Sequence, residues 1–172
     1  CALPIFRVGT DAQLGWFRYR YDVPGFGTPE GADVARFAPG VYLEPSARLG
    51  ALELTPGARV DWVALDTGWT RTAFDPRLAA SLSVGPSTTI QASVGGYSQF
   101  PDVREAVAEP SLGPQRSWQT SAGFVQDIGS DFTIEVTAYD NWLTDLVSGR
   151  EDAFGLFAGP PTAGPVDAAP YA

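Results

Sequence analysis

Residues suited to acid–base chemistry are scarce in this chain. Glu105 and Glu109 form a carboxylate pair of the kind that glycoside hydrolases use, but they lie in a polar, loop-like segment without a convergent partner. The sequence contains no His, which excludes triads with histidine and zinc–histidine sites. All 11 basic residues are Arg, so neither a phosphate-loop lysine nor a Schiff base is available. We therefore do not expect an enzyme.

Signals for a cofactor or a metal are equally weak. Residues 25–31 (GFGTPEG) superficially resemble a dinucleotide-binding glycine loop, but the spacing is wrong and no helix pattern follows. The net charge of −9 suits calcium as a loop ligand, yet no ordered Asp-x-Asp-x-Asp spacing supports it. The same acidic balance argues against nucleic acid as a partner. The sequence predicts no cofactor and no metal site.

The elements that must carry any site are indicated by alternating apolar residues. Residues 132–138 (FTIEVTA) place Phe, Ile, Val and Ala at every second position, which is the period of a strand with one apolar and one polar face. The same period recurs in residues 78–84 and 90–94. A soluble sandwich with its apolar face inward shows the same alternation, so the faces alone do not decide the class.

The connections between these runs are more informative. Residues 85–88 and 129–131 are tight-turn sequences, and a long polar segment, residues 100–116, separates the two hairpins. Short turns that alternate with long loops are typical of outer-membrane barrels. We also expect strands over residues 6–23, 41–48 and 52–65, a turn at 49–51, and loops at 24–40 and 66–75. Pro56 should lie near a turn or at a bulge, since it cannot donate to a ladder.

These patterns predict an all-β fold, an antiparallel meander of about seven strands that forms an incomplete part of a transmembrane β-barrel. Facing lipid we expect the aliphatic and aromatic positions Leu78, Leu82, Val84, Ile90, Ala92, Val94, Phe132, Ile134 and Val136. Facing a wet lumen we expect Arg77, Ser81, Ser83, Gln91, Ser93, Tyr97, Gln99, Thr133, Glu135, Thr137 and Tyr139. Gln126 is the exception on the apolar face, and it should lie near an interface or mark a bulge.

Five segments resemble the barrel of TonB-dependent outer-membrane transporters. They are residues 54–59 (LTPGAR, followed by Asp61), 74–78 (FDPRL), 96–101 (GYSQFP), 109–112 (EPSL) and the stretch from Ala138-Tyr139 to Asp145-Leu146-Val147. The resemblance implies import of a scarce nutrient, such as a ferric siderophore or cobalamin, across a Gram-negative-type outer membrane. It also implies three partners: outer-membrane lipid, the TonB complex (reached through a plug domain) and the small-molecule nutrient.

The resemblance further implies that loop residues grip the ligand. Aromatic side chains give rigid contact area, and Arg offers a forked donor to carboxylate or catecholate oxygens. The candidate ligand-binding residues are Trp69, Arg71, Phe100, Asp102, Arg104, Glu105 and Arg116.

The ends suggest a piece of a longer protein. We expect residues 1–5 to be a non-native scar, although Cys1 could instead be the lipidated cysteine of a lipoprotein. Residues 6–148 should form the partial barrel, and the Gly-, Pro- and Ala-rich residues 149–172 a loop or disordered tail. Seven strands are far fewer than the 22 of plugged transporters, and open edges are costly in hydrocarbon. We therefore expect truncation at both ends, with the plug upstream.

Two alternatives remain open. One is a passive channel or small closed barrel of about eight strands that works without TonB. The other is a secreted soluble β-sandwich that binds carbohydrate or protein. The transporter interpretation predicts that no second layer of the molecule covers the aliphatic side chains and that the middle third of the chain contains no helix.

Overall fold

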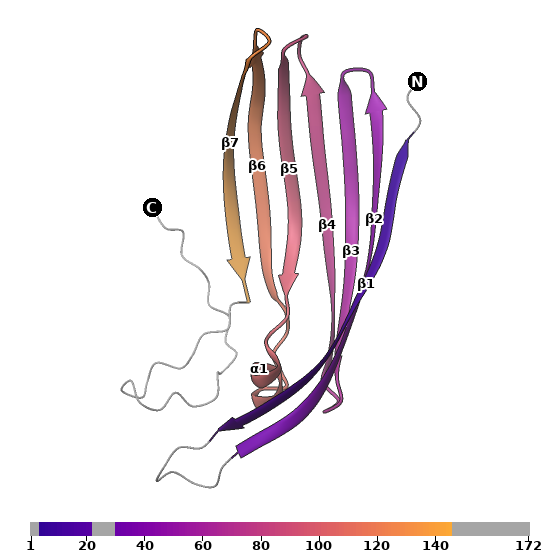
Figure 1. The fold of residues 1–172 in the computed structure, drawn as a ribbon, viewed down its shortest axis with the longest axis vertical. Coiled ribbons are helices and arrows are strands. Elements are labelled where there is room, and N and C mark those ends of the chain that lie inside the picture. The colour runs from indigo at the N-terminus through magenta and orange to yellow at the C-terminus, as the bar shows by residue number, and fades with distance from the viewer. Residues whose placement is uncertain (1–3, 22–29, 146–172) are drawn as a thin grey trace, which may run out of the picture.

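A single antiparallel sheet makes up almost all of the fold (Figure 1). The computed structural model describes residues 4–21 and 30–145. Seven strands follow one another in chain order, each hydrogen-bonded to the next, which confirms the predicted all-β meander. They are β1 (Ile5–Tyr21), β2 (Glu30–Leu49), β3 (Leu52–Leu65), β4 (Thr70–Ser83), β5 (Thr88–Gln99), β6 (Gln115–Ile128) and β7 (Phe132–Thr144).

The sheet is open within the part of the chain that the structure describes, because β1 and β7 lie at its two edges. The predicted extension of the first strand to Val23, the loop at residues 24–29 and the tail at 149–172 fall outside the described residues. Along every strand, successive side chains point to opposite faces of the sheet. The register therefore sorts the whole sheet into one mainly apolar face and one mainly polar face.

Short turns lie at one end of the sheet, at the top of Figure 1. Gly50 and Gly129 both have φ of +65°, the left-handed conformation that a glycine adopts without steric cost. Residues 84–87 connect β4 to β5, and residues 129–131 connect β6 to β7. The turns predicted at 49–51, 85–88 and 129–131 are confirmed.

The predicted loop over residues 24–40 is wrong for its second half, because β2 begins at Glu30 rather than at Val41. The long strand β1 supplies partners for all of this segment, from Tyr21 opposite Glu30 to Asp11 opposite Gly40. Pro and Gly in this stretch suggested a loop from sequence alone. The pairing with β1 outweighs that local preference.

The expected outer loop over residues 66–75 is also shorter than predicted. The backbone N–H of Leu65 donates to the carbonyl of Trp69 at 2.8 Å, which closes a tight turn over Asp66–Trp69. Gly68 has a φ of +92° within it. The strand β4 then begins at Thr70, so Arg71 and residues 74–75 belong to a strand.

Pro56 lies neither at a turn nor at a bulge. It sits inside β3 opposite Leu78 of β4. On its other side the ladder between β2 and β3 lacks pairs between Leu43–Ala58 and Ala47–Leu54, with the register unchanged across the gap. The unchanged register sets Pro56 opposite a second proline, Pro45, and neither has an N–H to leave unpaired. The facing pair of prolines thus explains how β3 tolerates a proline in its interior.

The expectation that the middle third contains no helix is wrong. A six-residue helix, α1 (Val103–Ala108), lies in the connection between β5 and β6, at the bottom of Figure 1. Asp102 and Glu105 form a reciprocal capping box at its start, which satisfies two backbone N–H groups. Among the described residues, no helix is long and apolar enough to cross a membrane.

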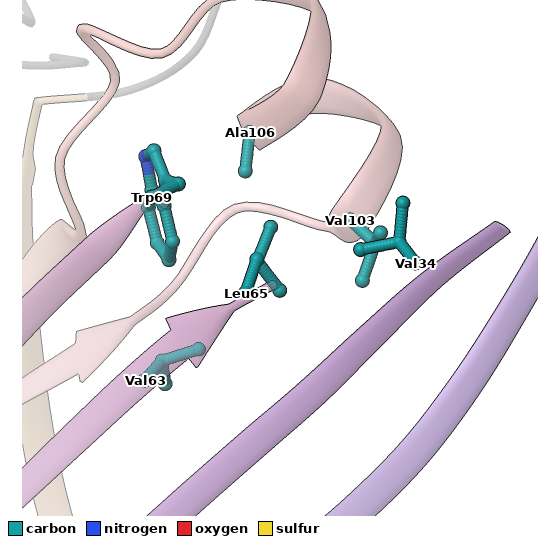
Figure 2. Close-up of a cluster of buried hydrophobic side chains, with 6 residues drawn as sticks. All are labelled: Val34, Val63, Leu65, Trp69, Val103 and Ala106. Carbon is teal, nitrogen blue, oxygen red and sulfur yellow. The ribbon is translucent and has the colours of Figure 1, made fainter. Parts of the chain in front are cut away.

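A small apolar core lies where α1 meets the sheet. Figure 2 shows Val103 beside Val34 of β2, and Ala106 above the end of β3 and the turn that follows it. The buried members of this cluster are Val34, Val63, Leu65, Trp69, Val103 and Ala106. By contrast, the aliphatic side chains assigned to lipid are not covered, since Ile90 is 47% and Val136 is 51% exposed.

Candidate functional site

The polar face of the sheet carries most of the charged side chains that the strands present. Arg7 pairs with Glu44 across β1 and β2, and Arg48 pairs with Glu53 across β2 and β3.

Gln126, the polar residue predicted on the apolar face, lies near the β6–β7 turn. There its side chain hydrogen-bonds to the hydroxyls of Ser87 and Thr88. Gln126 thus lies two residues from the end of β6, in an unbroken register that rules out a bulge, and its place near a membrane interface stays a prediction.

Arg59 is the centre of the polar face. Its guanidinium donates to both carboxylate oxygens of Asp11 on β1, at 2.9 and 3.1 Å, and to both oxygens of Asp61 on its own strand, at 2.6 and 2.7 Å. Bidentate pairing of this kind fixes a planar guanidinium in one orientation. The cluster therefore links β1 to β3 across the intervening strand β2.

Gly40 makes this link possible. It occupies the position on β2 between Asp11 and Asp61. A Cβ atom at Gly40 would collide with the guanidinium of Arg59 and the carboxylate of Asp61. The absent side chain thus lets a charged group lie flat across the strand.

A shallow hollow of about 330 Å³ opens beside this cluster. Asp11, Arg36, Arg59, Asp75 and Tyr97 contribute to its wall, and Phe100 borders it from the segment that leads to α1. The hollow therefore combines charged strand residues with the start of the longest described loop. Such a mixed surface can hold a small polar molecule.

Arg71 holds that loop against the sheet. Its guanidinium donates to the carbonyls of Pro110 at 2.7 Å and Leu112 at 3.1 Å, and it lies 5.3 Å from the centre of the Trp69 ring. Trp69 is 6% exposed, and its indole N–H has no hydrogen-bond partner among the described residues. Both residues therefore hold the loop in place: Arg71 binds its backbone carbonyls, and Trp69 packs in the core beneath it.

The acidic residues of the loop are also engaged with its backbone. Asp102 and Glu105 cap α1. Glu109 accepts hydrogen bonds from the hydroxyl and the backbone N–H of Ser111, and these bonds lower the pKa of the Glu109 carboxyl. Each of these carboxylates thus fixes a turn of the segment between β5 and β6.

The seven predicted ligand-binding residues are only partly brought together. Trp69, Arg71, Phe100, Asp102 and Glu105 surround or belong to the same loop. Arg104 is exposed on α1, close in sequence to them. Arg116 instead lies in β6, opposite Thr144, and alternation puts it on the face of Trp118, which is the apolar face.

Sequence reasoning missed the Arg59 cluster and the hollow beside it. Alternation puts Arg59 and Asp61 on the same face of one strand, but Asp11 comes from another strand and is 48 residues from Arg59 in sequence. The signal available in the sequence was Gly40, a glycine on the polar face whose cross-strand neighbours, Asp11 and Asp61, are both charged. Within residues 4–21 and 30–145, no group of three or more Cys, Asp or Glu side chains is arranged to hold a metal ion.

Comparison with known proteins places this geometry in context. Residues 5–166 match the family model described as TonB dependent receptor-like, beta-barrel. No curated protein matches the chain. Among solved structures, the FrpB iron transporter of Neisseria meningitidis (F3-3 variant) superimposes with a TM-score of 0.61 at 19% identity, over 70% of this chain and 20% of that protein.

Two further structures are similar. The copper transporter OprC has a TM-score of 0.64 at 16% identity, over 84% of this chain and 28% of that one. The alcaligin outer-membrane receptor FauA of Bordetella pertussis has a TM-score of 0.58 at 13% identity, over 94% of this chain and 34% of that one. The chain thus spans between a fifth and about a third of the length of the structures it resembles.

Proposed function

The chain belongs to the TonB-dependent receptor-like β-barrel family, and from this premise we propose that it forms part of the barrel of an outer-membrane receptor that imports a scarce nutrient. The family match over residues 5–166 is the observation that carries the proposal. The nutrient is a small molecule such as a ferric siderophore or cobalamin. Its uptake depends on energy delivered by the TonB complex through a plug domain of the full-length protein.

Three structural features support this proposal. The strands form one sheet with an uncovered apolar face, which suits lipid rather than a second sheet. The polar face carries ion pairs and the hollow, which suits a wet lumen. Turns are short at one end, and the longest described connection is at the other, as in outer-membrane barrels.

We propose that the nutrient contacts the loop end of the polar face. Arg104 is exposed on α1, and Phe100 is partly buried at the edge of the hollow, so both can reach a ligand there. Trp69, Arg71, Asp102 and Glu105 act on the ligand indirectly, because their side chains hold the loop in shape. Arg116 lies on the opposite face and is not part of this surface.

The names of the similar structures support the nutrient class only in general. They are described as an iron transporter, a copper transporter and a receptor for alcaligin. Identities of 13–19% transfer the fold and not the ligand. The proposal therefore commits to a scarce nutrient and leaves its identity to uptake measurements.

The test is uptake by cells that make the full-length protein as their only receptor of this family. Labelled ferric siderophores and cobalamin are offered under limitation, with and without a functional TonB. We expect at least one compound to accumulate, and only with TonB. A passive channel, the second candidate, would give uptake that persists without TonB and rises linearly with concentration. Failure to take up any compound, in cells where the protein is correctly inserted, would contradict the import of nutrients of these classes.

A further inference from the structure

Arg36 is a half-buried arginine of β2 that lines the hollow beside the Arg59 cluster. Within residues 4–21 and 30–145, its guanidinium forms no ion pair with a carboxylate. Four other strand arginines do form such pairs: Arg7, Arg18, Arg48 and Arg59. A guanidinium stays protonated in proteins and carries five N–H donors in a planar fork. Arg36 therefore offers this fork to a molecule that enters the hollow.

The register of the sheet keeps carboxylates away from Arg36. Its cross-strand neighbours are Gly15 of β1 and Leu65 at the end of β3, and neither carries a charge. The carboxylates of the Arg59 cluster lie level with Gly40, which is four residues from Arg36, or about 13 Å along β2. Arg36 is thus left without a charged cross-strand partner.

The acidic residues of the hollow are already engaged. Asp11 and Asp61 accept four hydrogen bonds from the guanidinium of Arg59, at 2.6–3.1 Å. Asp75 accepts two hydrogen bonds from β5. Three carboxylates against the two guanidinium groups of Arg36 and Arg59 give the hollow a charge of −1. The charge that lacks a partner among the described residues is nevertheless the positive charge of Arg36.

The hollow is open because long side chains lie flat against the sheet around it. The guanidinium of Arg59 lies across Gly40, and the ring of Tyr97 lies over Gly95, where a Cβ atom would be 3.2 Å from the ring. The remaining volume of about 330 Å³ equals that of about eleven molecules of liquid water, at about 30 Å³ each. The hollow therefore has room for a small molecule, or for one arm of a larger ligand.

Apolar contact is available next to Arg36. Ala38 lies two residues further along β2 on the same face, and Phe100 comes from the segment that leads to α1. Both line the hollow, and both also pack against the small apolar core, which fixes their positions. A ligand that matches these residues carries a planar anionic group beside an apolar or aromatic body.

We propose that Arg36 binds a carboxylate of the imported nutrient, whose adjoining apolar or aromatic group packs on Ala38 and Phe100. A carboxylate matches the fork of one guanidinium with two parallel hydrogen bonds. It brings one negative charge, whereas a phosphate monoester brings about −1.5 to −2 at pH 7 into a hollow that is already negative. The inference rests on the proposed function and deepens it, because it names the nutrient class as ferric chelates with a carboxylate arm.

Binding of small probes to the full-length protein in bilayer nanodiscs tests the site. The probes are benzoate, its uncharged counterpart benzamide, and phenyl phosphate, and saturation-transfer NMR measures their affinities. We expect benzoate to bind about 10-fold or more tightly than benzamide, because only the carboxylate forms charge-assisted hydrogen bonds. Phenyl phosphate should also bind more weakly than benzoate. Arg36→Gln should lower the affinity for benzoate to that for benzamide.

Two further variants make the result decisive. Arg77→Gln is the matched control, because Arg77 is a polar-face arginine without an ion pair in the described part of the chain and does not line the hollow. It should leave benzoate binding unchanged. Ala38→Phe fills part of the hollow without changing its charge and should weaken benzoate binding, so the test does not depend on Arg36→Gln alone. Benzoate binding that survives both changes, or its absence in the correctly inserted parent, would overturn the proposal.

Uptake measurements separate this inference from the transport proposal. TonB-dependent uptake of carboxylate-free nutrients alone, at a rate that Arg36→Gln leaves unchanged, would overturn the inference and leave the transport proposal intact. Benzoate binding that requires Arg36, without TonB-dependent uptake of any compound, would contradict the transport proposal and leave the carboxylate site in place.

Discussion

The carboxylate of Asp75 accepts two hydrogen bonds from Ser98, one from its backbone N–H at 3.1 Å and one from its hydroxyl at 2.7 Å. The ladder between β4 and β5 ends at Arg77 and Gly95, so this contact holds the two strands together beyond their last backbone pair. Ser98 is two residues from Phe100, where the chain leaves the sheet toward α1. One side chain thereby sets the direction in which the longest described loop departs.

Replacing Asp75 by Ala should weaken the contact that holds the end of β5 against β4. Loss of a carboxylate that accepts two bonds should cost about 1–3 kcal/mol, because the N–H of Ser98 would lose its partner. Hydrogen exchange in the reconstituted full-length protein should show faster exchange at Ser98 and in α1. Asp66→Ala, at an exposed turn position, is the matched control and should leave both unchanged. Unchanged exchange at Ser98 in the Asp75 variant would show that the contact does not hold the strands.

Arg71→Ala should release the loop from the sheet. The substitution removes two hydrogen bonds to the carbonyls of Pro110 and Leu112 and the contact with the Trp69 ring. We expect local opening to become easier by about 2 kcal/mol, or roughly 30-fold in the exchange of α1 amides. Affinity for the transported nutrient should fall with it.

The matched control for Arg71 is Arg104→Ala, on the exposed side of α1. This variant should lower nutrient affinity without changing the exchange of α1 amides, because Arg104 is proposed to contact the ligand and not the loop. If both variants changed exchange equally, the separate roles assigned to the two arginines would be wrong.

Much of the fold was predictable because alternation and turn chemistry agree. Residues 132–138 alternate cleanly directly after the tight turn at 129–131, and Gly129 has the φ that this turn requires. The errors arose where distant pairing overrides local preference. The segment 30–40 contains Pro and Gly, yet β1 pairs with all of it. Pro56 sits in mid-strand because Pro45 faces it, a match that no local window reveals.

The site was less predictable for the same physical reason. The residues that were singled out by type include four whose side chains turn inward or bind loop backbone: Trp69, Arg71, Asp102 and Glu105. Whether an Arg meets a ligand or a carbonyl depends on packing contributed by another segment. The Arg59 cluster depends on Asp11, which is too distant in sequence for a local pattern to reveal. It also depends on Gly40, because any side chain at that position would collide with the cluster.

Acid should loosen the segment after α1. Hydrogen bonds from Ser111 lower the pKa of Glu109 from its ordinary value of 4.5. A carboxyl with a lowered pKa in the folded state adds stability that is present above pH 4.5 and is lost as the pH falls through the folded-state pKa. Exchange of the Ser111 amide, corrected for its intrinsic pH dependence, should therefore accelerate below pH 4.5.

Glu109→Gln isolates this effect from the other carboxyls of the loop. In this variant the corrected exchange rate of the Ser111 amide should no longer change with pH over that interval. An identical pH profile in variant and parent would show that the Ser111 contact is not responsible.

Gly40→Ala should disrupt the polar face. Its methyl group would occupy the space of the Arg59 guanidinium and the Asp61 carboxylate, so the ion cluster must separate. We expect a loss of about 1–3 kcal/mol in the free energy of unfolding, measured by denaturant titration in bilayers. Gly113→Ala, where a Cβ atom meets nothing within 4 Å, is the control and should be nearly neutral. Equal stability of the two variants would mean that Arg59 can leave its site at no cost.

Adjacent residues on β7 test which face meets lipid. Val136 and Thr137 are neighbours in sequence, so their side chains point to opposite faces of the sheet, and both lie near the middle of the strand. Val136→Arg should destabilise the bilayer-inserted fold by about 2–4 kcal/mol, the cost of a charge on the lipid face at mid-depth. Thr137→Arg, on the polar face, should cost well under half as much, because the lumen hydrates its guanidinium. Both are measured by urea titration of the full-length protein in the same lipid. Equal costs, or a larger cost at Thr137, would contradict the assignment of the two faces.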